Sequence, residues 1–347
     1  MSDYAVSQVY PSDKRSLAGV DALLHREGIT RDGNLDYICA MRDENDEIIA
    51  TGSCFGCTLR CFAVSREHQG EGLLNEIISH LMEVQMARGN LHLFLYTKMN
   101  SARFFGDLGF YEIARVDGTL VFMENRKNGF PGYLKALEKT KTGGVSGALV
   151  MNANPFTLGH QYLVETAAAQ CDTLHLFVLS EDASLVPFAV RKKLVQAGVA
   201  HIPNVVLHDS GPYIISSATF PSYFLKDAAA VIEGHARLDL AVFTKIAGAL
   251  NVTKRFVGEE PTSQVTGLYN EIMARELPKA GIECHVVPRK QAAGQAISAS
   301  TVRLALQKGD WESLKMLVPQ TTLDYFQSPE AAPVLERIRR ADNVIHY

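Results

Sequence analysis

The sequence has no apolar stretch that approaches the roughly 20 residues needed to cross a bilayer. Its first ten residues, MSDYAVSQVY, lack a basic segment followed by an apolar core. An excess of either charge is absent too, because 34 lysines and arginines are balanced by 38 aspartates and glutamates. This balance gives no electrostatic reason to expect nucleic acid as a partner. We therefore expect a cytoplasmic protein with neither a membrane nor a nucleic-acid partner.

Cysteines are few, and three of the six, Cys54, Cys57 and Cys61, have a spacing that could suggest a zinc or iron–sulfur site. No fourth ligand of suitable spacing follows them. The surrounding TGSCFGCTLRCFAV instead predicts two strands around Gly56, in which the cysteines act as small apolar residues. We expect reduced thiols and no metal ligands among the protein side chains.

The length of 347 residues fits two domains, because it exceeds what one ordinary core supports. The first domain is expected over residues 1–125, with a short strand, a capped helix, hairpins and buried strands. A long helix should follow the Gly-rich turn QGEG, since Leu73, Ile77 and Leu81 recur at helical spacing. This mixture predicts an α+β domain.

A linker is expected over residues 126–144, which contain a basic run, Pro131 and a closing Gly-Gly. In residues 145–347, short apolar runs typical of strands alternate with helical patterns. That alternation predicts a doubly wound, Rossmann-like parallel sheet, so the fold class of the whole chain is α/β. Ligands of such sheets bind beyond the carboxyl ends of the strands.

Two motifs in the first domain resemble those of the GNAT acetyltransferase family. They are Gln69-Gly70-Glu71-Gly72 and, later, NSARFFGDLGF over residues 100–110. In that family the Gly-rich turn binds the pyrophosphate of acetyl-CoA through backbone N–H groups at a helix N-terminus. The resemblance implies that Gln69, Gly70 and Gly72 bind a CoA-like group. Leu74 stands where the family prefers Gly or Ala, which argues against ordinary acetyl-CoA use.

The most informative stretch covers residues 147–169, GALVMNANPFTLGHQYLVETAAA. It predicts a buried strand, a tight turn and a helix that opens at Leu158. Unpaired N–H groups and the positive end of the helix dipole converge at such a helix start, which suits a phosphate. Thr157 offers a hydroxyl, Gly159 allows close backbone approach, and His160 can donate to an oxyanion.

Thr157-Leu158-Gly159-His160 resembles the T/H-x-G-H motif of the nucleotidyltransferase superfamily. In that superfamily the His stabilises the α-phosphate during an in-line displacement, and the first residue of the motif bonds phosphate oxygens. The resemblance implies that His160 and Thr157 are catalytic. It also implies contacts with ATP along the same turn, at Asn152, Asn154, Pro155, Phe156 and Gly159.

A second motif, Ile297-Ser298-Ala299-Ser300-Thr301-Val302-Arg303, resembles the I-S-x-S-x-x-R motif near the end of the same superfamily. Hydroxyls and a guanidinium within one helical entry turn suit the β- and γ-phosphates of ATP. We expect contacts with ATP at Ser298, Ser300, Thr301 and Arg303, and Mg²⁺ to neutralise the phosphates. The two motifs together are more specific than either alone.

The segment FVGEEP, residues 256–261, predicts a strand that runs into a turn at the ligand-binding edge. By resemblance, Gly258 and Glu259 would meet the nucleoside, although a simple cap of the next helix explains Glu259 equally well. Arg191, Lys192 and Lys193 could place a cation near the phosphates. A solvated helix face is the alternative explanation for at least two of them.

Residues 211–224, GPYIISSATFPSYF, are rich in hydroxyls and aromatic rings. The mixture suits a pocket for a small carboxylate or a lid over it, and packing of an irregular segment is an equal alternative. In the first case Tyr213, Ser216 and Thr219 would contact the substrate.

These features together make the whole chain resemble the citrate lyase ligase family. The resemblance implies an AMP-forming acid–thiol ligase that makes acetyl-adenylate and diphosphate from ATP and acetate. The acetyl group would then pass to the thiol of the CoA-like prosthetic group on the acyl-carrier subunit of citrate lyase. The GNAT-like domain would bind that prosthetic group.

Two other functions stay open at this point. One is a fusion of an acetyl-CoA-dependent N-acetyltransferase with a nucleotide or pantetheine adenylyltransferase. The other is a nucleotide sensor that binds ATP without turnover, against which the two intact phosphate motifs argue.

Overall fold

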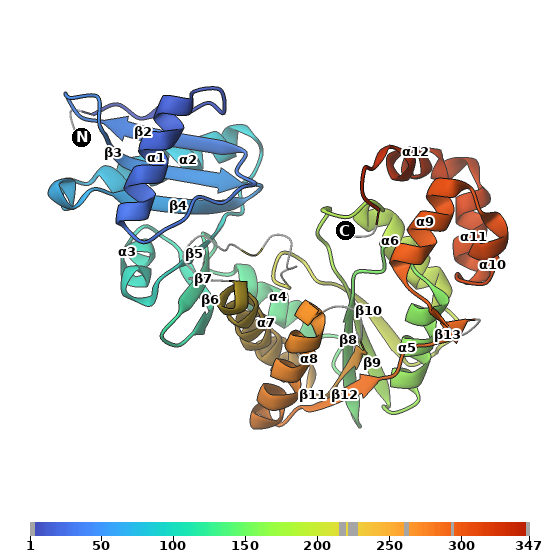
Figure 1. Cartoon of the computed structure of the whole chain (residues 1–347). Helices are drawn as coiled ribbons and strands as arrows, with labels where there is room; N and C mark the ends of the chain where they lie inside the picture. Colours follow the sequence, from blue (N-terminus) through green and yellow to red (C-terminus); the bar gives the residue numbers. More distant parts are fainter. Residues whose placement is uncertain (1–3, 215–219, 221–227, 260–263, 293–294, 345–347) are drawn as a thin grey trace. The chain divides into compact units, whose positions relative to one another are not determined.

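The computed structural model describes residues 4–214, 220, 228–259, 264–292 and 295–344. The chain divides into two compact units, Met1–Tyr133 with Phe220–Ala241, and Leu134–Thr219 with Val242–Tyr347. Each unit is built around its own sheet (Figure 1). The expected domain limits, 1–125 and 145–347 with a linker over 126–144, stay a prediction. Among the described residues, no helix is long and apolar enough to cross a membrane.

The first unit contains a seven-stranded sheet of order β1-β2-β3-β4-β5-β7-β6. Its strands are β1 (Ser7–Gln8), β2 (Tyr37–Arg42), β3 (Ile48–Phe55), β4 (Thr58–Val64), β5 (Phe94–Thr97), β6 (Tyr111–Val116) and β7 (Leu120–Glu124). All neighbouring pairs are antiparallel except β4 and β5, which run parallel. The strands predicted around Gly56 are confirmed as β3 and β4.

Helices cover both faces of this sheet. They are α1 (Lys14–Arg26), α2 (Leu73–Ala87), α3 (Ala102–Asp107) and the start of α4 (Gly129–Glu138), with short 3-10 turns at Arg66–His68 and Met99–Ser101. Successive side chains of β2 point to opposite faces of the sheet. Ile38 and Ala40 pack with the leucines of α1 on one face. Cys39 and Met41 pack with those of α2 on the other face. The first unit is therefore an α+β layer structure, as predicted.

The second unit contains a five-stranded, fully parallel sheet of order β10-β9-β8-β11-β12. Its strands are β8 (Ser146–Met151), β9 (Thr173–Val178), β10 (Val205–Asp209), β11 (Val252–Gly258) and β12 (Glu283–Val287), and a small hairpin joins β13 (Gln291–Ala292) to β14 (Gln295–Ala296). The strand order reverses at β8, so the topological switch point lies between β8 and β11. The predicted doubly wound parallel sheet is confirmed.

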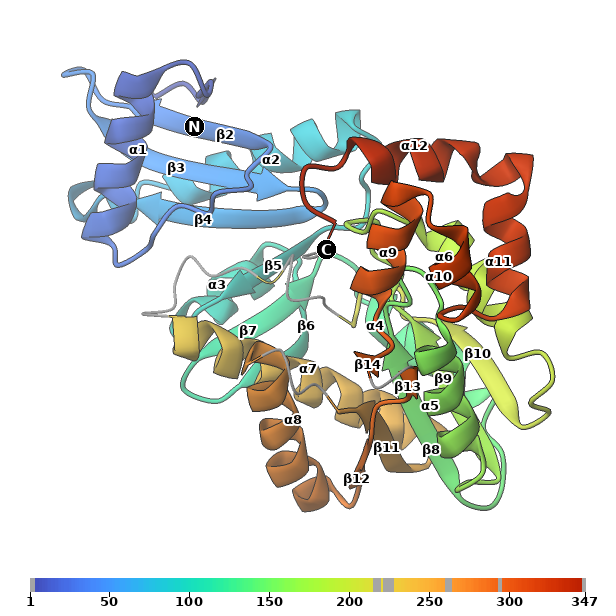
Figure 2. The same cartoon turned by 45° about the vertical axis from the view of Figure 1, so that its right-hand side comes forward.

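The helices that follow β8 along the chain are α5 (Leu158–Ala168), α6 (Phe188–Gly198), α7 (Ala228–Leu250), α8 (Gln264–Glu276), α9 (Ala299–Lys308), α10 (Trp311–Lys315), α11 (Gln320–Gln327) and α12 (Ala332–Arg340), with 3-10 turns at Leu277–Ala280 and Pro329–Ala331. Helix α7 begins in the first unit and ends in the second. Leu174, Leu176 and Val178 of β9 face one core with α5, α6 and α9. Helices α9 to α12 pack together beside α6 (Figure 2). This packing sets the start of α9 opposite the start of α5.

Candidate functional site

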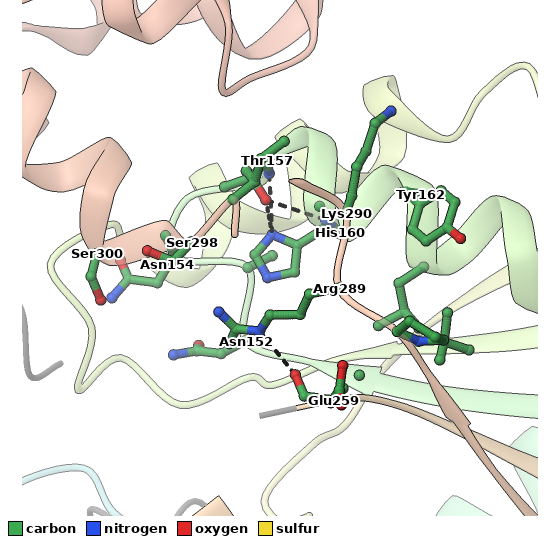
Figure 3. Close-up of a pocket in the computed structure, with 18 of the residues that line it drawn as sticks. Asn152, Asn154, Thr157, His160, Tyr162, Glu259, Arg289, Lys290, Ser298 and Ser300 are labelled. Carbon is green, nitrogen blue, oxygen red and sulfur yellow. Dashed lines mark hydrogen bonds between the residues drawn. The ribbon is translucent and has the colours of Figure 1, made fainter. Parts of the chain in front are cut away.

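A cavity of about 300 Å³ lies at the switch point of the parallel sheet, where β8, β11 and β12 end. Its walls contain residues of the turn after β8, of the starts of α5 and α9, and of the segment after β12 (Figure 3). Ten of the predicted site residues line it, namely Asn152, Asn154, Thr157, Gly159, His160, Gly258, Glu259, Ser298, Ser300 and Arg303. Two motifs about 140 residues apart thus form one cavity.

His160 is held in place by Thr157, the N-cap of α5. The backbone N–H of Thr157 donates to His160 Nδ1 at 3.1 Å, and the backbone N–H of His160 donates to Thr157 Oγ1 at 3.2 Å. Because Nδ1 accepts a hydrogen bond, the ring proton of the neutral imidazole is on Nε2. Nε2 points away from Thr157, toward the side on which Arg289 lies (Figure 3). The arrangement presents an N–H donor to the cavity.

The imidazole is neutral at ordinary pH. Burial among protein groups and, to a smaller extent, the positive charge of Arg289 together lower the pKa of His160 to about 4. The ring also stacks on Phe156, with centroids 5.8 Å apart. Phe156 is fully buried, so it supports the imidazole from the core side. His160 is therefore oriented as a neutral hydrogen-bond donor.

Close packing brings the two phosphate motifs together. A Cβ on Gly159 would lie 3.1 Å from the backbone oxygen of Ile297, which is tighter than ordinary contact. Ser298 caps α9 by accepting from the backbone N–H of Thr301 at 3.1 Å. The approach of the second motif thus favours glycine at position 159, and the N-termini of α5 and α9 border the same cavity.

Arg303 lines the cavity, yet the residue is only 2% exposed, and its guanidinium bonds to two backbone carbonyls and to the hydroxyl of Ser300. Its Nη1 donates to the carbonyl of Asn154 and its Nε to the carbonyl of Val344, each at 2.6 Å. Burial lowers its pKa to about 10, so it remains a cation. Arg303 therefore fixes the turn after β8, and its direct contact with phosphate stays a prediction.

A second buried guanidinium fixes the same turn from another side. Arg191 is fully buried and its Nη1 donates to the backbone oxygen of Asn152 at 2.9 Å and to its side-chain oxygen at 2.8 Å. Asn154 Oδ1 accepts from the backbone N–H of Val186 at 3.0 Å. Between the two asparagines, Ala153 has φ of 51°, a left-handed conformation that costs a non-glycine residue about 1–2 kcal/mol. The contacts around it hold this strained turn at the cavity.

Sequence reasoning missed the cations that follow β12. Arg289 and Lys290 line the cavity, and Arg289 Nε donates to the backbone oxygen of Glu259 at 2.9 Å. The Lys290 ammonium lies 5.8 Å from the ring centre of Tyr162, another wall residue. The sequence did contain a signal for these cations. Pro288-Arg289-Lys290 directly follows a predicted strand of the parallel sheet, and ligands of such sheets bind at the carboxyl ends of the strands.

Several predicted residues lie elsewhere. Pro155, Phe156 and Thr301 are outside the cavity lining, and Tyr213 is buried away from it. Ser216 and Thr219 lie outside the described residues. Roles of these residues in substrate binding stay predictions. Lys192 and Lys193 form ion pairs with Asp209 and Glu330 on the surface.

The first unit has its own pocket, of about 540 Å³. Its lining includes the predicted Gln69, Gly70 and Gly72, together with Phe62, Ala63 and Val64 of β4 and Tyr96 and Thr97 of β5. The parallel strands β4 and β5 pair only at Thr58–Phe94 and Leu59–Leu95, so they separate beside the pocket. Gly72 has φ of 82° and precedes α2 without a side-chain cap, which leaves backbone N–H groups at the pocket edge.

Comparison with known proteins gives consistent matches. The family model of the citrate lyase ligase C-terminal domain matches residues 146–326. A [citrate [pro-3S]-lyase] ligase of Haemophilus influenzae is 38% identical over 91% of this chain and 96% of its own length. The same-named protein of Escherichia coli is 39% identical over 93% of both chains.

Solved structures match the chain over a smaller part. An acetyltransferase of the GNAT family from Staphylococcus aureus is 14% identical, with a TM-score of 0.30, and covers 35% of this chain and 97% of its own. Escherichia coli ElaA is 15% identical, with a TM-score of 0.32, over 35% of this chain and 99% of its own.

The curated relatives are ligases, and their matches extend over nearly the whole chain, so this protein is an enzyme of that class. More particularly, the chain belongs to the citrate lyase ligase family.

Proposed function

We propose that the protein acetylates the thiol prosthetic group on the acyl-carrier subunit of citrate lyase, with ATP and acetate as co-substrates. An acetate oxygen attacks the α-phosphorus of ATP, and the bond to the β-phosphate oxygen breaks to release diphosphate. The thiol sulfur then attacks the acetyl carbon, the bond to AMP breaks, and the thiol proton leaves to solvent. The products are acetyl-citrate lyase, AMP and diphosphate.

The orientation of His160 is the observation that carries this proposal. Adenylyl transfer depends mainly on positioned donors that stabilise charge on the phosphoryl oxygens. Nε2–H of His160 would donate to a non-bridging oxygen of the α-phosphate as the pentavalent state forms. Thr157 supports this role by occupying Nδ1 and thereby fixing the tautomer.

The leaving diphosphate would lie at the start of α9. Ser298 and Ser300 line the cavity there, and the N-terminus of the helix carries a partial positive charge. Mg²⁺ is usually bound by substrate phosphates, waters and one or two carboxylates. Glu259 is a carboxylate on the cavity wall and would complete such a set, which departs from the expectation of no metal ligand among the protein side chains. The ion would neutralise the charge of the phosphates.

The pocket of the first unit would hold the CoA-like prosthetic group. Such a group combines a phosphate end with an extended amide chain. The N-terminal turn of α2 suits the phosphate, and the separated strands β4 and β5 leave backbone groups that can pair with amides. The two pockets would therefore serve the two half-reactions.

Acetate-dependent exchange between ATP and labelled diphosphate tests the first half-reaction. We expect exchange in the wild type and a loss of about 10²- to 10³-fold in His160→Ala, since one preorganised donor is removed. His201→Ala, a change at an exposed His of the same unit, is the matched control. Equal exchange rates in His160→Ala and the control would overturn the catalytic role of His160.

A further inference from the structure

We propose that Arg289 is a catalytic residue that binds the α-phosphate of the nucleotide together with His160. The inference rests on the function proposed above and adds a residue that neither phosphate motif contains. Arg289 follows β12, and its side chain lies between His160 and Glu259 on the cavity wall (Figure 3).

The Arg289 side chain is anchored at the edge of the sheet. Its Nε donates to the backbone oxygen of Glu259 at 2.9 Å, which ties the residue to the end of the neighbouring strand β11. The backbone N–H of Glu259 in turn donates to the backbone oxygen of Val287 at 2.9 Å. The guanidinium is thus positioned by the sheet edge itself, as preorganised catalysis requires.

Two hydrogen-bond donors, from His160 and Arg289, converge in the cavity. His160 presents Nε2–H toward the side on which Arg289 lies, and a guanidinium offers only donors. Two donors repel each other unless an anion lies near both. The same proximity explains why the charge of Arg289 contributes to the low pKa of His160. The region between the two side chains is therefore suited to a phosphoryl oxygen.

Arg289 differs from Arg303, the arginine of the second motif, in its access to the cavity. Arg303 is 2% exposed; it donates to the carbonyls of Asn154 and Val344 and to the hydroxyl of Ser300, so its hydrogen bonds go to protein groups. Arg289 is only partly buried and opens on the cavity. A cation can stabilise developing charge only where the substrate can reach it, and Arg289 meets that condition better.

The test compares Arg289→Gln and Arg289→Lys with the wild type in acetate-dependent ATP–diphosphate exchange. We expect exchange to fall about 10²- to 10³-fold in Arg289→Gln, and less in Arg289→Lys, which keeps the charge but loses the fork. Arg275→Gln, an exposed arginine on α8, is the matched control and should exchange like the wild type. Exchange in Arg289→Gln equal to that of the control would overturn the proposal.

Two further measurements do not depend on turnover. In Arg289→Gln the pKa of His160, followed by NMR of the free protein, should rise from about 4, whereas Arg289→Lys should keep it low. Calorimetry should show weaker binding of ATP in Arg289→Gln than in the control. An unchanged His160 pKa or unchanged ATP binding in Arg289→Gln would contradict the role of Arg289. A lack of exchange in the wild type would instead contradict the proposed function, and these two measurements would still test Arg289.

Discussion

His160 is a donor whose protonation state is set by the protein around it. Its Nδ1 accepts from the backbone of Thr157, and burial and Arg289 lower its pKa to about 4. A lowered pKa means that the folded protein takes up this proton only at a pH well below 6.5. At pH values well above its pKa of about 4, the imidazole keeps the neutral form that the site requires.

This state leads to a prediction for the pH dependence of the reaction. Between about pH 5.5 and pH 8, the exchange rate should show no step due to His160, because the residue stays neutral throughout. The measurement is the exchange rate at saturating ATP and acetate across this range. A step centred near 6.5 in the wild type that disappears in His160→Asn would contradict the assignment.

The residue scale also shows where sequence reasoning reached its limit. Thr157 and Ser298 could be identified from the sequence as residues at helix starts, because each side chain accepts from a backbone N–H only three residues away. The function of Arg303 could not, since it bonds to carbonyls 149 and 41 residues distant in the chain. Arg289 belongs to no motif, and only the packing of β11 against β12 brings it to Glu259.

At the scale of elements, β9 and β10 bury a pair of histidines. His175 Nδ1 and His208 Nε2 lie 2.9 Å apart, so one neutral ring donates to the other. His208 also stacks on Phe177. The pKa of both residues is lowered to about 4, that of His175 by burial and that of His208 by burial and, second, by the charge of His175. Two neutral rings fit here, and two charged ones do not.

We therefore predict that the second unit loses stability in mild acid. In the unfolded chain both histidines take up protons near pH 6.5, whereas in the folded protein they do so only near pH 4. The stability is complete above pH 6.5 and falls between these values, by about 3 kcal/mol for each histidine and so on the order of 6 kcal/mol for the pair. Urea unfolding at several pH values measures it.

The variant for this prediction is the double change His175→Asn and His208→Asn. It should be less stable than the wild type at neutral pH, but its stability should vary less between about pH 7 and pH 5. His201→Asn, at an exposed position, serves as the control and should keep the acid sensitivity. Equal acid sensitivity in the double variant would show that other groups cause it.

Most elements could be predicted from the sequence because their signals are local. Helix α5 begins at Leu158, as the Thr157 cap and the preceding strand indicate, and β3 and β4 flank Gly56. The parallel order was predictable from the alternation of strands and helices. The left-handed turn at Ala153 was not, because long-range bonds from Arg191 and Arg303 to its neighbours hold it.

At the scale of the whole molecule, the described part of each compact unit contains a pocket of its own. The proposed reaction assigns adenylate formation to one pocket and the prosthetic group to the other. If this assignment is correct, the two half-reactions can be impaired independently. Family membership indicates the overall reaction but does not divide it between the pockets.

Asn75→Asp tests this division. Asn75 is exposed in the first turn of α2 and lines the pocket of the first unit. An added negative charge would repel a phosphate there, while it leaves the shape of the side chain unchanged. We expect the KM for citrate lyase to rise about two- to fivefold and the ATP–diphosphate exchange to stay unchanged. Asn128→Asp, an exposed asparagine outside the lining, is the control. A parallel loss of exchange would argue against separate pockets.

The central claim is that ATP cleavage drives acetylation of the carrier thiol. Its most direct test is the formation of AMP in a mixture of the enzyme, ATP, acetate and thiol-form citrate lyase. We predict AMP and acetyl thioester in equal amounts, and neither product when acetate or the thiol protein is omitted. Acetyl transfer from acetyl-CoA without ATP, or thioester formation without AMP, would contradict the account.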